Sequence, residues 1–213
     1  MDNHKHTHFE IGGMDKQVIL NEHAIPTREA TRRSGDMQWD NETLRVFVDA
    51  SELNEQGIFG LAGCFVGQGE VFTRMKKHYN LKFKGQNPYA ECMAILFVIQ
   101  LLPSVIKKKY TKPKKIIIFS DLVQFDWFDK VETPFHDVQM NLIIAQIRDN
   151  LKAIGNLFPD IQFNIRYMSK TLKRHNPFYR AAHNAARKAI QINRLSFELR
   201  GIFKINKDFI LGW

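Results

Sequence analysis

The chain has 213 residues, of which 44% are hydrophobic and 25% are charged. This composition excludes an intrinsically disordered protein and leaves room for one domain with extensions. The net charge is +9 and the sequence pI is about 9.6, an excess that favours a polyanionic partner, nucleic acid before an acidic membrane surface. Because many basic proteins bind no polyanion, charge alone leaves this open.

The N-terminus, one apolar run and the cysteines bear on where the protein works. Residues 1–8 contain no apolar core, so we expect no secretory signal. The most apolar run, 89–106, contains polar residues and Pro103, and we expect it to be too short and too polar to cross a bilayer. Cys64 and Cys92 lie in apolar stretches that are typical of reduced, buried thiols. The sequence therefore predicts a cytoplasmic protein without a membrane partner.

The ends of the chain differ in pattern from its middle. Residues 1–40 lack periodicity and are expected to form a flexible extension. Its alternating histidines at 4, 6 and 8 can bind a transition metal, although a solvated tail is the commoner meaning of such a segment. A domain is predicted over 41–192. The tail 193–213 is expected to pack on it, because its large aromatic residues are costly to expose. No pattern indicates the oligomeric state.

The first half of the predicted domain contains strands and one helix. Leu44–Val48 is apolar and β-branched, as in a buried strand. Apolar runs over 57–66 and 70–83 follow at short intervals, which predicts an antiparallel meander. From Asn87, a favourable N-cap, to Leu102 the residues are apolar on nearly every face, which predicts a buried helix that ends at Pro103.

The second half alternates between strands and helices. A lysine-rich loop is predicted over 107–115, followed by a continuous apolar run at 116–119 that is typical of a central strand. Helices are predicted over 122–130, 138–155 and 177–192, and a strand over 161–168. This order predicts an α/β fold, a mixed five-stranded sheet flanked by helices.

Three acidic residues stand out against this pattern. Asp49 and Asp121 each follow a predicted strand, and neighbouring parallel strands that end in this way bring their carboxylates to one edge of a sheet. Glu91 lies in the first turns of the apolar helix, where a carboxylate is costly unless it binds an ion or lies at an edge. A single strand-end aspartate is more often a turn residue. The three together predict a metal centre, because a divalent cation relieves the repulsion of clustered carboxylates.

The motifs around these residues resemble the type 1 ribonuclease H family. The resemblance covers about 44–192 and lies in four segments: Val-Asp-Ala-Ser at 48–51, Asn-Pro-Tyr-Ala-Glu at 87–91, Phe-Ser-Asp at 119–121 and Tyr-Arg-Ala-Ala-His-Asn-Ala-Ala-Arg at 179–187. It implies the ribonuclease H-like fold and an endonuclease that hydrolyses the RNA strand of RNA–DNA hybrids, using two Mg²⁺ or Mn²⁺ ions.

The resemblance also implies a role for each ligand. Asp49 bridges the two ions, Glu91 and Asp121 hold the ion that activates water, and His183 supports the other ion. The family often has aspartate at this last position. Imidazole is a legitimate ligand, but it removes a negative charge and favours nitrogen-tolerant metals over Mg²⁺. His183 can also be a histidine on a helix face without a metal role.

A second departure leaves other functions open. Leu122 and Val123 stand where the family often has polar residues that touch the hybrid. The main alternative is therefore a non-catalytic or weakly active nucleic-acid-binding module with the same fold. A third possibility is an exonuclease or a resolvase. Exonucleases of the related fold usually carry Asp-x-Glu on the first strand, and 49–51 reads Asp-Ala-Ser.

Further residues are expected to touch nucleic acid. Ser51 and Asn87 match family positions that contact substrate, although they can equally be a turn residue and a helix cap. The basic segments 107–115 and 170–176 fit a phosphate track, or only a solvated face. In the second segment the family has a mobile histidine-bearing loop, and the residues expected to bind nucleic acid there are Lys173, Arg174 and His175.

Overall fold

A five-stranded mixed sheet forms the centre of the protein. The computed structural model describes residues 27–110, 113–126, 128 and 130–191. The strands are β1 (Thr43–Glu52), β2 (Ile58–Gly67), β3 (Glu70–Tyr79), β4 (Lys115–Ser120) and β5 (Gln162–Tyr167). They lie in the order β3-β2-β1-β4-β5, with β1, β2 and β3 antiparallel and β1, β4 and β5 parallel. The predicted meander and mixed sheet are confirmed.

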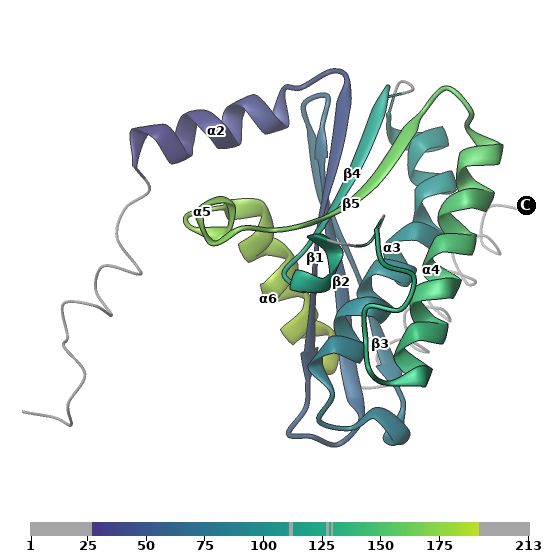
Figure 1. Cartoon of the computed structure of the whole chain (residues 1–213). Helices are drawn as coiled ribbons and strands as arrows, with labels where there is room; N and C mark the ends of the chain where they lie inside the picture. The colour runs from purple at the N-terminus through teal and green to yellow at the C-terminus, as the bar shows by residue number, and fades with distance from the viewer. Residues whose placement is uncertain (1–26, 111–112, 127, 129, 192–213) are drawn as a thin grey trace, which may run out of the picture.

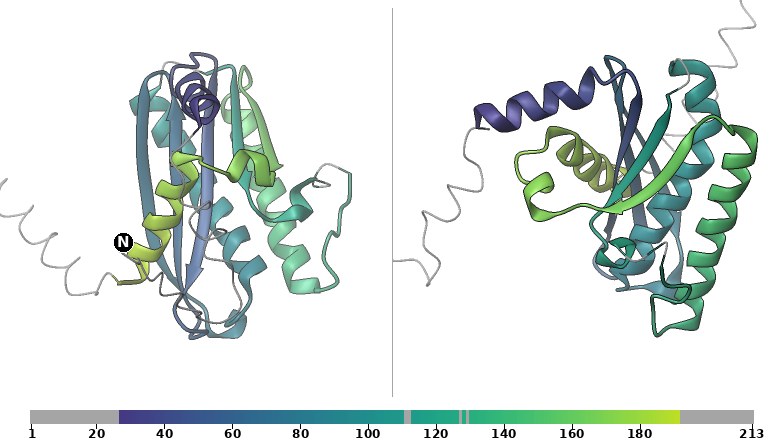
Figure 2. Two further views of the ribbon diagram at one scale, coloured as in Figure 1. Left: turned by 90° about the vertical axis from the view of Figure 1, so that its left-hand side faces the viewer. Right: turned by 45° about the horizontal axis from the view of Figure 1, so that its top comes forward.

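Helices cover both faces of this sheet (Figure 1). Helices α3 (Asn87–Lys109) and α4 (Val138–Leu157) lie together on one face, and α6 (Pro177–Gln191) crosses β1, β2 and β3 on the other. The short helix α5 (Lys170–Lys173) and helix α2 (Arg28–Gln38) lie on the side of α6. The turned views in Figure 2 show the sheet between the two helical layers. The predicted α/β class is therefore correct.

The alternation of β1 decides which side chains face each layer. Leu44, Val46 and Val48 belong to the large core cluster that also contains the buried face of α3. Phe47 belongs to a second cluster with Phe178 of α6, on the other face. Since successive side chains of a strand point to opposite faces, Asp49 shares the face of Phe47 and points toward α6.

Helix α3 runs nearly two turns beyond its expected end. Pro103 lies inside the helix, which continues to Lys109, so the predicted loop over 107–115 is wrong for its first residues. An internal proline costs about 3 kcal/mol. Val105 and Ile106 are both buried after it, and the burial of two such side chains, at about 1.5–3 kcal/mol each, offsets that cost.

Helix α3 also has the length and composition of a membrane-spanning helix. Among the described residues, the segment Asn87–Lys108 is long and apolar enough to cross a membrane by length and composition, with a mean hydropathy of 1.9 over its window. Our expectation that it is too short and too polar is therefore wrong. Most of that window is buried inside the protein, against the sheet and α4, as in the core helix of a soluble fold.

Three other segments differ from expectation. The third strand ends at Tyr79, and a 3-10 turn at Leu81–Phe83 follows it. In the described residues of the predicted helix over 122–130, the structure has a 3-10 turn at Val123–Asp126. Part of the predicted flexible extension is the helix α2, which Thr27 caps by accepting a hydrogen bond from the Ala30 N–H.

Other expectations fall on residues that the structure does not describe. The histidines at 4, 6 and 8 and the tail 193–213 lie outside the described residues, and the bounds of the domain stay a prediction.

The close approach of α6 to β2 generates a stability prediction. A Cβ added at Gly60 would lie 1.9 Å from the carbonyl oxygen of Ala186, whereas one added at Gly35 in α2 meets nothing within 4 Å. We expect Gly60→Ala to lower the free energy of unfolding by about 1–3 kcal/mol, because backbone must move. Gly35→Ala should raise it by about 0.5–1 kcal/mol through helix propensity. Urea titrations measure both, and equal effects would contradict the packing of α6 on β2.

Candidate active site

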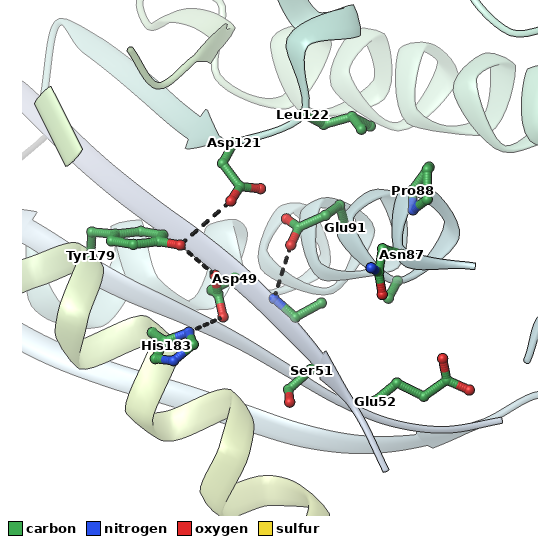
Figure 3. Close-up of a pocket in the computed structure, with 12 residues that line it drawn as sticks. Asp49, Ser51, Glu52, Asn87, Pro88, Glu91, Asp121, Leu122, Tyr179 and His183 are labelled. Carbon is green, nitrogen blue, oxygen red and sulfur yellow. Dashed lines mark hydrogen bonds and ion pairs between the residues drawn. The ribbon is translucent and has the colours of Figure 1, made fainter. Parts of the chain in front are cut away.

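Three carboxylates converge at one edge of the sheet, as the sequence predicts (Figure 3). Phe47 of β1 pairs with Phe119 of β4 in parallel register, so Asp49 and Asp121 each lie two residues beyond the same rung. Glu91 reaches them from the second turn of α3. One oxygen atom from each of the three carboxylates lies within 4.8 Å of the others.

Hydrogen bonds tie Glu91 to the ends of both strands. The Ala50 N–H on β1 donates to Glu91 Oε1 over 3.3 Å, and the Ser120 hydroxyl at the end of β4 donates to Oε2 over 3.5 Å. Ser120 Oγ in turn accepts the Leu122 N–H at 3.2 Å. The helix and the two strands therefore hold this carboxylate in a fixed orientation.

Burial and mutual repulsion disfavour the charged forms of these groups. Burial raises the pKa of Glu91 well above its usual value, and the carboxylates of Asp121 and Asp49 raise it further. Burial also raises the pKa of Asp49, which is 3% exposed; His183 and Tyr179 oppose that effect and Asp121 adds to it. Nearby positive charge would stabilise the ionised cluster.

Helix α6 contributes two side chains, one turn apart, to Asp49. The Tyr179 hydroxyl donates to Asp49 Oδ1 over 3.0 Å and lies 3.5 Å from Asp121 Oδ2. Burial and these carboxylates raise the pKa of Tyr179, so it stays a donor. His183 Nδ1 lies 3.1 Å from Asp49 Oδ2. Because an ionised carboxylate only accepts, Nδ1 carries the proton of this bond, and a neutral ring then keeps its lone pair on Nε2.

Lys173 contacts the same cluster from α5. Its Nζ lies 2.7 Å from Asp121 Oδ2 and 4.6 Å from the centre of the Tyr179 ring. We had expected Lys173 to contact phosphate, with Arg174 and His175 beside it. The structure instead directs its ammonium group to a carboxylate. Arg174 is exposed and His175 is half-buried, and neither lines the cavity described next.

A cavity of about 400 Å³ opens over the cluster. Ser51 and Asn87, both expected to touch substrate, line it together with the carboxylates and His183. Asn87 is the first helical residue of α3 and Gln86 is the N-cap, so Asn87 does not cap the helix as we expected. Leu122 also lines the cavity, which places one departure from the family pattern at the site.

The sequence analysis did not predict that Tyr179 and Lys173 contact the carboxylates. Tyr179 opens the segment that carries His183 and lies four residues before it, a spacing that puts two residues on one face of a helix. This spacing was the available signal. Lys173 had no comparable signal, because the α5 turn carries several basic residues and only the tertiary structure selects one of them.

The residues present fit a divalent metal centre. The donors are carboxylate oxygens, the ligands that Mg²⁺ and Mn²⁺ prefer. Burial raises the pKa values of Glu91 and Asp49, and neighbouring carboxylates raise them further. A divalent ion bound to these closely spaced groups would relieve that repulsion. His183 stands beside the three carboxylates, bonded to Asp49, rather than within their group.

The raised pKa of Glu91 predicts how stability changes with pH. A carboxyl group with a raised folded-state pKa binds its proton more tightly when folded, so its contribution to stability is lost as pH rises through that pKa. We expect the metal-free protein in EDTA to lose stability as the pH rises from the ordinary pKa range of a glutamate toward neutral and alkaline pH, and Glu91→Gln to lose clearly less. Urea unfolding across this range measures it.

The exposed Glu29 of α2 provides the control. Glu29→Gln should keep the pH dependence of the parent protein. A parent curve that is flat, or one that Glu91→Gln leaves unchanged, would contradict the repulsion described above.

Comparisons with known proteins are limited to solved structures. No family model and no curated protein matches the sequence. The structure of LC11-RNase H1, isolated from compost by a metagenomic approach, is 14% identical, with a TM-score of 0.51, and the match covers 71% of this chain and 96% of that one.

Two further solved structures match less closely. RNase H1 from the halophilic archaeon Halobacterium salinarum NRC-1 is 13% identical, with a TM-score of 0.45 and coverage of 68% and 99%. LC11-RNase H1 in complex with RNA/DNA hybrid is 10% identical, with a TM-score of 0.43 and coverage of 69% and 99%. The likeness to the first LC11 structure, together with the strand order and the helices on both faces, shows that this chain has the ribonuclease H-like fold.

Proposed function

We propose that the protein is a metal-dependent nuclease that hydrolyses the RNA strand of RNA–DNA hybrids. The observation that carries this proposal is the convergence of Asp49, Glu91 and Asp121 at one cavity, on a chain with a net charge of +9. LC11-RNase H1, which has the same fold, has been solved in complex with RNA/DNA hybrid, and this favours the hybrid as the first substrate to test.

The chemistry proposed is hydrolysis of a phosphodiester bond. Two Mg²⁺ or Mn²⁺ ions held at the cluster would activate water and stabilise the leaving 3′-oxygen, which gives 5′-phosphate and 3′-hydroxyl products. Asp49 would hold both ions, Glu91 and Asp121 the ion beside the attacking water, and His183 the other. Tyr179, by its hydrogen bond to Oδ1, keeps the Asp49 carboxylate in one orientation.

The remaining residues of the proposal act on the substrate. Ser51 and Asn87 line the cavity and would contact the sugar–phosphate backbone. Arg174 is exposed at the end of α5, next to Lys173, and would contact a phosphate. Both cysteines are buried and free, which agrees with action in the reducing cytoplasm.

Two observations favour a second candidate, a nucleic-acid-binding module without catalysis. Leu122 brings an apolar side chain to the cavity, and Lys173 pairs with Asp121, one of the carboxylates that catalysis needs. The two candidates differ in one measurement, the cleavage of labelled RNA–DNA hybrid, double-stranded RNA and single strands with Mg²⁺ or Mn²⁺. Cleavage of the hybrid in its RNA strand supports the nuclease. Salt-sensitive binding without cleavage supports the module.

Neutralising either aspartate of the cluster should abolish cleavage. We expect Asp49→Asn and Asp121→Asn each to lower the rate about 100-fold or more, since metal-ion catalysis contributes several kcal/mol. Hybrid binding should persist. The control is Asp126→Asn, the same substitution at an exposed residue that does not line the cavity. A rate near that of the parent in Asp49→Asn would refute the proposed metal centre.

The histidine beside the cluster should set the metal preference. Mg²⁺ prefers oxygen ligands, whereas Mn²⁺ accepts imidazole more readily, so we expect faster cleavage with Mn²⁺ than with Mg²⁺. His183→Asp should shift the ratio of the two rates toward Mg²⁺. His175→Asp is the matched control, because His175 does not line the cavity. Equal rates with both metals in the parent and in His183→Asp would show that His183 is no ligand.

A further inference from the structure

We propose that Lys173 is a resident cation of the carboxylate cluster, which competes with a divalent ion for Asp121 and so lowers the affinity of the site for metal. The proposal rests on the metal centre of the proposed function, and not on cleavage. It changes the role that the sequence predicts for Lys173 from a phosphate contact to a direct influence on metal binding.

The contact between Lys173 and Asp121 has the geometry of a charge-assisted hydrogen bond. Nζ lies 2.7 Å from Oδ2, and the two side chains are 39% and 29% exposed, so water screens them only in part. The same ammonium lies 4.6 Å from the centre of the Tyr179 ring, where the face of an aromatic ring attracts a cation. Two independent contacts therefore place the ammonium beside the carboxylates.

The backbone under Lys173 is held in place. Ser169 caps α5 by accepting the Leu172 N–H at 3.2 Å. Before it, the Met168 N–H donates to the Ser120 carbonyl over 2.7 Å, next to Asp121. After it, Arg33 Nη2 on α2 donates to the Arg174 carbonyl over 3.1 Å. The turn that carries Lys173 is thus fixed to β4 and to α2.

The segment around Lys173 contains no acidic residue of its own, so its negatively charged partner comes from the carboxylate cluster. The segment 161–191 contains no Asp or Glu, and its seven Lys and Arg residues are Arg166, Lys170, Lys173, Arg174, Arg180, Arg187 and Lys188. Two other positively charged residues lie in α5 or at its end, Lys170 and Arg174, and both are exposed. Only Lys173 among the three has an ion pair in the described part of the chain.

The consequence for metal binding follows from charge and from shared ligands. A divalent ion that uses Asp121 must displace the ammonium from Oδ2 or accept a positive charge nearby. Both effects weaken binding, and they act on the ion that depends most on Asp121. A neutral side chain of similar length at position 173 removes both effects.

The test measures metal binding directly, without substrate. Titration of the full chain with Mn²⁺ in a calorimeter compares the parent with Lys173→Met and Lys173→Gln. We expect both neutral variants to bind the weaker Mn²⁺ ion about tenfold more tightly, or about 1.4 kcal/mol. Lys173→Arg should stay close to the parent, because it keeps the charge.

The matched control is Lys170→Met, which removes the same charge from the same short helix at an exposed residue. It should leave the affinity within about twofold of the parent, as expected for a screened surface charge. The proposal is overturned if both neutral variants stay within twofold of the parent, or if Lys170→Met matches their increase. Two neutral variants keep the test valid if one of them fails to fold, which thermal unfolding in EDTA reveals.

The outcome separates this inference from the proposed function. Tighter Mn²⁺ binding in the neutral variants supports the resident cation even if the parent cleaves no hybrid. Cleavage by the parent with unchanged Mn²⁺ affinity in the variants overturns the resident cation and leaves the nuclease standing. No Mn²⁺ binding by any variant overturns the metal centre and this inference together.

Discussion

Repulsion between three carboxylates is the constraint around which the rest of this structure is arranged. The parallel pairing of β1 with β4 brings Asp49 and Asp121 to one edge of the sheet, and α3 adds Glu91 from the side of the core. Burial and the neighbouring carboxylates raise the pKa values of Glu91 and Asp49, so the ionised cluster is costly. A fold gains no stability from such a cluster, so its presence indicates a function that needs concentrated negative charge.

The groups that contact these carboxylates come from different layers of the fold. On the side of α3, the Ala50 N–H and the Ser120 hydroxyl of the neighbouring strands donate to Glu91. On the opposite face, α6 and α5 supply a phenol, an imidazole and an ammonium group. Contacts on the side of α3 thus fix the orientation of Glu91, and contacts from α5 and α6 change the charge around Asp49 and Asp121. Substitutions in α5 and α6 can therefore alter the site without disturbing the core between the sheet and α3.

The sequence predicted what depends on local pattern. The buried strands that lead to Asp49 and Asp121 follow from apolar runs, although β1 continues past Asp49 to Glu52. A helix carrying Glu91 follows from its composition. The continuation of α3 beyond Pro103 could not be predicted, since it depends on tertiary burial of the residues that follow. The contact of Lys173 with the cluster has the same origin, because 52 residues of chain separate it from Asp121.

The hydrogen bond from Arg33 to the Arg174 carbonyl has a consequence for how the protein is divided. Composition places the start of the domain near residue 41, which makes that position a natural choice for a shortened protein. Cutting there would remove α2, and with it a side chain that holds the far end of the α5 turn. The N-terminal helix therefore supports the turn that carries Lys173, although it lies before the first strand and contributes no residue to the cavity lining.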